Sequence, residues 1–246
     1  MVEAVEKLGQ PRSGLSGFLR EALRSLGAGG IVPVALALLV LLTFSNIVIL
    51  QNMPAKASPP AAAFLVAAVL RVGGLLLIAV AILRMLTASP RRRWLPDGGF
   101  WLYVLTFAVS TGVTAAVALL MGSRTGLANL ILSNVLVTLL LSPFVVWFVA
   151  LAVVKPLAWR PGPWLRHFGK WWPPVLFWTL LLVTPMAVLH ATIDMRLIAG
   201  AGESFWPLAL FDGALSTIMA LLAIAINAAG YRRVAEDHGS RLSART

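Results

Sequence analysis

Long apolar segments alternate with short polar ones along the whole chain. Six of these segments are apolar over 20 residues or more, which is the length an α-helix needs to cross a hydrocarbon layer of about 30 Å. Backbone groups in lipid must find their hydrogen bonds within the segment, which favours helices. The pattern predicts an all-α polytopic membrane protein with six transmembrane helices, at residues 31–50, 61–83, 100–121, 127–154, 173–193 and 207–230.

Two segments outside the spans have an amphipathic pattern and are predicted to be interfacial helices. Residues 13–30 place six apolar side chains on one helical face before three glycines end the pattern. A soluble helix packed on cytoplasmic loops is the alternative for this segment. Residues 155–172 repeat the arrangement with a face rich in tryptophan. The two faces consist of Leu15, Phe18, Leu19, Ala22, Leu23 and Leu26, and of Trp164, Leu165, Phe168, Trp171 and Trp172.

Composition excludes an ordinary soluble domain. Of the 246 residues, 59% are hydrophobic and only 12% are charged, and the mean hydropathy is +0.89. Lys and Arg outnumber Asp and Glu by 20 to 9, but the basic residues lie mainly in the loops, so topology explains them without nucleic acid. The chain has no cysteine, which excludes disulfides and thiolate ligands.

The basic residues alternate between the two sides of the predicted membrane. Sixteen belong to the N-terminal segment, the two long loops and the C-terminal tail, and three to the short loops. The positive-inside rule then predicts a bacterial inner-membrane protein with a cytoplasmic segment at residues 1–30, a transmembrane domain at 31–231 and a cytoplasmic tail at 232–246. Arg91, Arg92 and Arg93, with Trp164, Trp171 and Trp172, are expected at the lipid headgroups.

Two residues interrupt the apolar spans. Pro143 is expected to kink the fourth span. Arg71 lies near the middle of the second, where one arginine costs about 3 kcal/mol against about 4 to 8 kcal/mol gained from the apolar residues, so the segment still inserts. Asp212 is the one acid well inside a predicted span. We therefore expect an ion pair between Arg71 and Asp212 that joins the second and sixth spans, as a purely structural clamp or as part of a functional site.

Other polar residues lie at helical spacing within the spans. His190 and Asp194 are four residues apart, so they share one face, and they are expected to join Arg71 and Asp212 or simply to end a helix in water. Two ligands are too few to predict a metal site. Ser216 and Asn227 form a stripe on the sixth span, and Asn134 and Thr138 form one on the fourth. Hydrogen bonds between helices explain these stripes, and a polar path beside Arg71 is the functional alternative.

Motifs of known catalytic chemistry are missing from the sequence. It contains no paired intramembrane carboxylates, no metalloprotease or nucleophile-elbow motif, and no nucleotide-binding loop. Acids and histidines are few, so the chain offers few residues for general acid–base catalysis. We expect a protein that is not an enzyme and that has no cofactor.

The two ends of the chain carry a family resemblance. The run Gly17-Phe-Leu-Arg-Glu-Ala-Leu23 and the run Ala223-Ile-Ala-Ile-Asn-Ala-Ala-Gly-Tyr-Arg-Arg233 are similar to the ends of a bacterial family of six-helix inner-membrane proteins. That family includes the membrane segment fused to glycerophosphodiester phosphodiesterases. This chain lacks the phosphodiesterase domain, so the resemblance implies a membrane module and no catalytic residue.

The sequence leaves three functions open. The first is an accessory or structural membrane module that binds lipids, a membrane-protein partner or a second copy of itself. The second is a small transporter or permease subunit with a polar site around Arg71, because buried ionisable groups often line substrate paths. A membrane enzyme is the third. A water-accessible site at Arg71 favours transport, whereas a dry and paired Arg71 favours a scaffold.

Overall fold

The computed structural model describes residues 14–27, 30–54, 59–121, 126–154, 159–200 and 202–243. Within these ranges the regular structure is helical, without strands, and turns such as residues 87–97 connect the helices. The elements are α2 (Leu15–Leu26), α3 (Ile31–Gln51), α4 (Ala62–Leu86), α5 (Gly98–Met121), α6 (Leu127–Leu141), η1 (Ser142–Phe144), α7 (Val145–Val153), α8 (Gly162–Phe168), α9 (Trp172–Trp178), η2 (Thr179–Val183), α10 (Thr184–Ile198), η3 (Gly202–Ser204) and α11 (Phe205–Ser243).

The predicted all-α, six-span architecture is confirmed. Among the described residues, six helical stretches are long and apolar enough to cross a membrane, and each coincides with a predicted segment. The largest difference is in α11, which continues as a helix to Ser243, past the end predicted at Gly230. Tyr231 to Ser243 contains no proline, and Gly239, the one glycine in this stretch, does not end the helix.

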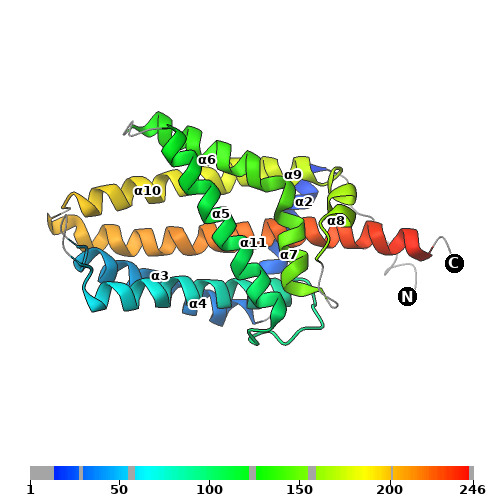
Figure 1. Ribbon diagram of the computed structural model, residues 1–246, viewed down its shortest axis with the longest axis horizontal. Helices are drawn as coiled ribbons and strands as arrows, with labels where there is room; N and C mark the ends of the chain where they lie inside the picture. The colour runs from blue at the N-terminus through cyan, green and yellow to red at the C-terminus, as the bar shows by residue number, and fades with distance from the viewer. Residues whose placement is uncertain are drawn as a thin grey trace.

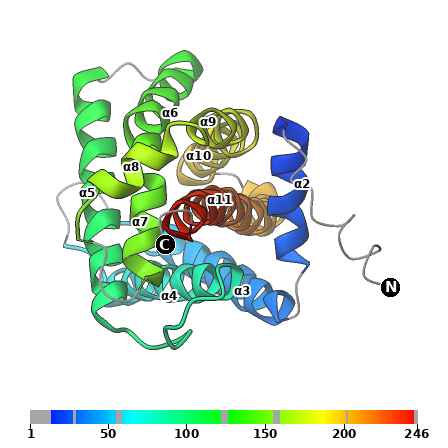
Figure 2. The ribbon, with the colours of Figure 1, turned by 90° about the vertical axis from the view of Figure 1, so that its right-hand side faces the viewer.

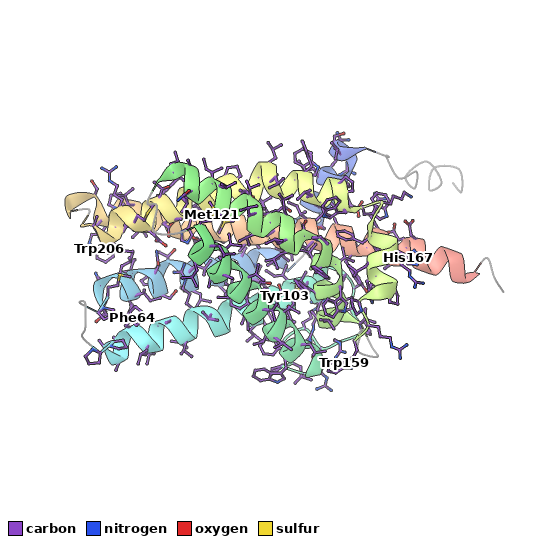
Figure 3. The ribbon with its side chains drawn as sticks, turned by 45° about the horizontal axis from the view of Figure 1, so that its top comes forward. Phe64, Tyr103, Met121, Trp159, His167 and Trp206 are labelled. Carbon is purple, nitrogen blue, oxygen red and sulfur yellow. The ribbon has the colours of Figure 1, made fainter. Side chains whose placement is uncertain are left out.

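The last helix, α11, is the central element of the bundle. It lies between the α3–α4 pair, the α9–α10 segment and α7, and α5 crosses the bundle obliquely beside α6 (Figures 1 and 2). Half of the apolar window of α11 is buried, against 11% of that of α5. We call the end of the bundle that carries α2, α8 and the last turns of α11 the terminal end, and the other end the opposite end. Trp159 and His167 lie toward the terminal end, and Phe64 and Trp206 lie at the opposite end (Figure 3).

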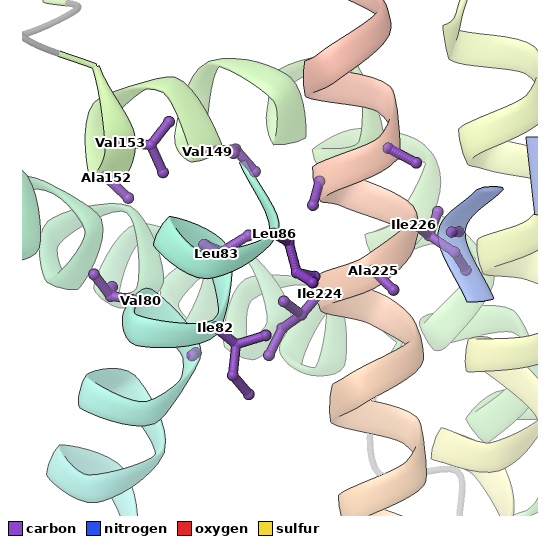
Figure 4. Packing of buried hydrophobic residues seen from close by; sticks show 14 of the residues in the cluster. Val80, Ile82, Leu83, Leu86, Val149, Ala152, Val153, Ile224, Ala225 and Ile226 are labelled. Carbon is purple, nitrogen blue, oxygen red and sulfur yellow. The ribbon is translucent and has the colours of Figure 1, made fainter. Parts of the chain in front are cut away.

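The main hydrophobic core fills the terminal half. Side chains of α4, α7 and α11 meet there, including Ile82, Val149 and Ile224 (Figure 4). Ala225, Ala228 and Ala229 of α11 are fully buried, and a Cβ on Gly230 would come within 2.8 Å of Val175 Cγ2. Small residues let helix backbones approach closely. In lipid, where the hydrophobic effect does not drive helices together, this van der Waals packing stabilises the bundle.

Two spans are interrupted. The proline break expected at Pro143 is confirmed, because Ser142–Phe144 forms a 3₁₀ turn between α6 and α7. The fifth span contains a π-helical turn at Thr179–Val183 between α9 and α10. A π turn accommodates about one extra residue in a helix and is often found at functional sites.

The two predicted amphipathic helices differ from expectation in different ways. The first is present as α2, which lies across the bundle axis with Phe18 and Ala22 buried (Figure 2). Glu21 pairs with Arg232 and Arg233 of α11, so α2 is fixed to the bundle. The second is shorter than predicted: α8 covers Gly162–Phe168, a turn follows, and Trp172 already belongs to the fifth span. Residues 155–158 of that prediction lie outside the described residues.

Candidate functional site

Six polar side chains meet inside the apolar bundle near its opposite end, and we call this group the polar centre. It consists of Asn46 of α3, Arg71 of α4, His190 and Asp194 of α10, and Asp212 and Ser216 of α11. His190 lies eight residues before the end of α10, and Asp212 lies seven residues after the start of α11, which places both roughly 10 to 12 Å from that end of their helices.

Asp212 is the most buried member of the polar centre, with 0% of its side chain exposed. Its Oδ1 lies 2.6 Å from His190 Nδ1, and its Oδ2 accepts a hydrogen bond from Asn46 Nδ2 at 3.0 Å. A buried carboxylate is costly unless its oxygens are bonded, and here both are. Asp212 therefore links α11 to α10 and to α3.

His190 and Asp194 form the more accessible side of the polar centre. Their side chains are 21% and 30% exposed, and His190 Nε2 lies 3.5 Å from Asp194 Oδ2. Ser216 Oγ lies 3.3 Å from His190 Nδ1, on the side facing α11. Asn46 Nδ2 also donates to Asp194 Oδ1 at 3.4 Å, so a single carboxamide contacts both carboxylates.

The predicted direct ion pair between Arg71 and Asp212 is wrong. Arg71 Nη1 donates to the backbone oxygen of Leu42 at 3.2 Å, and Asp212 takes His190 as its hydrogen-bonding partner. Both Asp194 and Asp212 still act electrostatically on the Arg71 guanidinium. The sequence correctly brings the four ionisable residues together, but histidine rather than arginine makes the direct contact.

Close helix packing brings these side chains together. A Cβ on Gly213 would lie 1.9 Å from Thr43 Oγ1 and 2.9 Å from Thr43 Cα, so α3 and α11 touch through the backbone of Gly213. Asn46 is one turn beyond Thr43 and therefore reaches Asp212, the neighbour of Gly213. A Cβ on Gly74 would lie 2.6 Å from Leu41 Cδ2, so α3 and α4 also pack closely beside Arg71.

The structure adds a third potential metal ligand to the two that the sequence offers. One ligand atom from each of His190, Asp194 and Asp212 lies within 4.8 Å of the others. Nitrogen and carboxylate oxygen donors suit zinc and other first-row divalent cations. With neutral His190, the two aspartates and Arg71 leave a net charge of −1, which favours uptake of a cation.

The other predicted polar stripes do not join the polar centre. Asn134 Nδ2 donates to Leu130 O in its own helix, whereas Thr138 Oγ1 lies 3.4 Å from Thr184 Oγ1 and so links α6 to α10. The predicted hydrogen bond between helices is therefore wrong for Asn134, whereas Thr138 makes the predicted kind of contact. Asn227 lies roughly 16 Å along α11 from Ser216. It lines a separate cavity of about 210 Å³ with Tyr103, Thr106 and Ser110.

The residues expected at lipid headgroups divide into two groups. Arg92 and Arg93 are exposed, so that prediction stands for them. The tryptophans bond within the protein: Trp171 Nε1 donates to Asp237 Oδ2, Trp172 Nε1 donates to Ser142 Oγ, and Trp164 stacks on Tyr231. Their indoles join the bundle to the segments at its terminal end.

Arg91 is not free for lipid, because it belongs to a buried charge network. Arg84 Nη2 and Arg91 Nη1 each contact Asp97 at 2.6 Å, and their side chains are 0% and 5% exposed. Burial alone would raise the pKa of the Asp97 carboxyl, but hydrogen bonds from Arg91, the Phe100 N–H and Arg84 outweigh it and hold that pKa below its usual value. One carboxylate thus pairs with two buried guanidinium groups and balances one of their two positive charges.

This lowered pKa predicts a pH dependence of stability. The carboxyl of Asp97 titrates near pH 3.9 when unfolded and at a lower pH when folded, so its contribution is present above about pH 5 and is lost as the pH falls through the folded pKa. Unfolding temperatures measured between pH 3 and 7 should show the wild type converging on Asp97→Asn below about pH 4. A difference that stays constant down to pH 3 contradicts the assignment.

Comparisons with protein-family models, curated proteins and solved structures gave no match for this chain. The resemblance of its two ends to the six-helix family therefore stays a prediction. The candidate site rests on the geometry of the polar centre.

Proposed function

We propose that this protein is a non-enzymatic integral membrane protein that acts as a small transporter or permease subunit, with the polar centre as the site that a solute or ion occupies. The observation that carries the proposal is the convergence of Arg71, His190, Asp194 and Asp212 from three helices inside an apolar bundle. Ionisable side chains at membrane depth are costly, and in membrane proteins they commonly mark ion, proton or substrate pathways.

The exposure of the polar centre supports this function over a purely structural one. A structural clamp is expected to be dry, with each charge paired. Here His190 and Asp194 stay partly exposed, and Arg71 donates to a backbone oxygen instead of a carboxylate. The site therefore keeps charged groups available for a visiting solute.

An accessory or structural module is the second candidate. The short contact between His190 and the fully buried Asp212 favours it, because such a pair fixes the register of α10 against α11. In this role the protein would support the lipid environment, a membrane-protein partner or a second copy of the chain.

We place the protein in the bacterial inner membrane, with both termini in the cytoplasm. The support is the distribution of basic residues, which concentrates them in the segments at the terminal end. Membrane lipids surround the apolar outer faces of the bundle, and the polar centre then opens toward the outer side.

Cysteine labelling tests whether the polar centre is open to water, because the chain has no cysteine of its own. His190→Cys should react with a membrane-impermeant maleimide in right-side-out vesicles about tenfold faster, or more, than Leu189→Cys. Leu189 is a neighbour at the same depth and 44% exposed, but it does not belong to the polar centre. Apolar surroundings suppress the reactive thiolate, so a lipid-facing cysteine reacts slowly.

Equal, slow labelling at both positions contradicts the transport proposal and favours the accessory module. Labelling should also slow when Asp194 is changed to leucine, since this substitution makes the accessible side apolar.

A further inference from the structure

We propose that the polar centre binds one divalent cation of the zinc class, with His190 Nε2 and the Asp194 carboxylate as its protein ligands. The inference deepens the transport proposal by naming the class of solute, and it rests on that proposal for the passage of the cation. Binding itself follows from the geometry of the polar centre alone.

The separation of the two ligand atoms suits such a cation. Bonds of about 2.0–2.1 Å at tetrahedral angles place neighbouring ligand atoms about 3.3 Å apart. His190 Nε2 and Asp194 Oδ2 are 3.5 Å apart, on one face of α10 and on the accessible side of the polar centre. A cation between them needs almost no movement of either side chain, and water or a solute completes its coordination.

The groups behind the ligands hold them in the required state. Asp212 is fully buried and contacts His190 Nδ1 at 2.6 Å, so the proton of neutral imidazole belongs on Nδ1 and Nε2, 3.5 Å from Asp194 Oδ2, keeps a free lone pair. This carboxylate–histidine–metal arrangement is the usual outer support of a zinc ligand. Asn46 donates to both carboxylates and so fixes the orientation of Asp194.

The charge of the polar centre also favours a cation. With His190 neutral, as a metal ligand must be, Asp194 and Asp212 carry −2 against the single positive charge of Arg71, and Arg71 donates to Leu42 O. Asp212 is the third potential ligand of this group and here supports His190 from behind, so the two direct ligands leave positions for exchangeable water, as an open rather than a closed zinc site requires.

Isothermal titration with zinc chloride tests the proposal on the full chain, purified in detergent without a histidine tag at pH 7.5. The wild type should bind one Zn²⁺. Asp212→Asn should weaken binding about 10- to 100-fold, as loss of an outer carboxylate does, and His190→Gln and Asp194→Asn should weaken it by more than about 100-fold.

Thr192→Ala, on the same helix, should bind like the wild type, because its hydroxyl bonds to Val188 O in its own helix. His238→Ala controls for binding to another histidine.

Thermal unfolding separates loss of the site from loss of the fold. Zinc should raise the unfolding temperature of the wild type and of Thr192→Ala but not of Asp194→Asn, whose unfolding temperature without zinc should stay close to that of the wild type. Zinc binding that persists in His190→Gln, or a wild type that binds none, overturns the proposal.

The two experiments can fail independently. Fast labelling of His190→Cys without zinc binding contradicts the metal site and supports a water-accessible site. Zinc binding with slow labelling supports a static structural ion and contradicts the transport proposal.

Discussion

Replacing Asp97 with alanine is expected to lower the free energy of unfolding by about 3–5 kcal/mol, the cost of leaving buried charges without their partner. Arg84 and Arg91 share this carboxylate, and neither side chain reaches solvent to any extent. Arg84 keeps its bonds to the backbone oxygens of Ala152, Arg92 and Leu95, which reduce the loss but do not neutralise its charge. Denaturation in mixed micelles measures the difference.

The exposed arginine of the same loop provides the control. Arg92→Ala removes a side chain that is solvent-exposed, and the bond from Arg84 uses the backbone oxygen of Arg92, so this variant should stay within about 0.5 kcal/mol of the wild type. Asp97→Asn should lie between the two, because its amide keeps an acceptor without the charge. An Asp97→Ala protein as stable as Arg92→Ala shows that the network does not stabilise the fold.

Replacing Gly213 with alanine should cost about 1–3 kcal/mol, although alanine is the better helix former. The added Cβ meets both the side chain and the backbone of Thr43, and backbone atoms cannot rotate away. The helices α3 and α11 must therefore separate, and Asn46 should lose contact with Asp212. Unfolding in mixed micelles reports the first effect, and weaker zinc binding reports the second.

A second glycine in a lipid-exposed helix is the matched control. Gly112 of α5 has nothing within 4 Å of an added Cβ, so Gly112→Ala should be neutral or stabilise by up to about 1 kcal/mol. Adding Thr43→Gly to Gly213→Ala should recover part of the loss by restoring the space between the helices. If Gly213→Ala behaves like Gly112→Ala, the close approach of α3 and α11 is not what the structure indicates.

Hydropathy predicts the six spans well. A backbone group without a hydrogen bond is costly in lipid, so every residue of an apolar segment favours the helix. It predicts side-chain partners poorly. The sequence predicts that Arg71 pairs with Asp212 because both are charged and at membrane depth, yet the actual contact depends on how α10 is rotated against α11. That rotation places His190 beside Asp212.

Two important residues gave little signal in the sequence. Asn46 lies five residues before the end of a long apolar helix and resembles an ordinary interfacial residue, but it contacts both acids of the polar centre. Arg84 looks like a positive residue at the membrane boundary, yet the chain from Arg92 to Asp97 folds back over it and supplies its acceptors. Such contacts arise from tertiary packing, which periodicity does not report.

The π-helical turn in the fifth span determines the direction in which His190 and Asp194 of α10 face. Trp172 is held by Ser142 at one end of this span, and His190 is held by Asp212 near the other. Each residue in a helix turns the chain by about 100°, so the extra residue accommodated at Thr179–Val183 rotates one half of the span against the other by roughly that angle. A chain one residue shorter at this turn could keep its tryptophan anchor or its histidine contact, but not both.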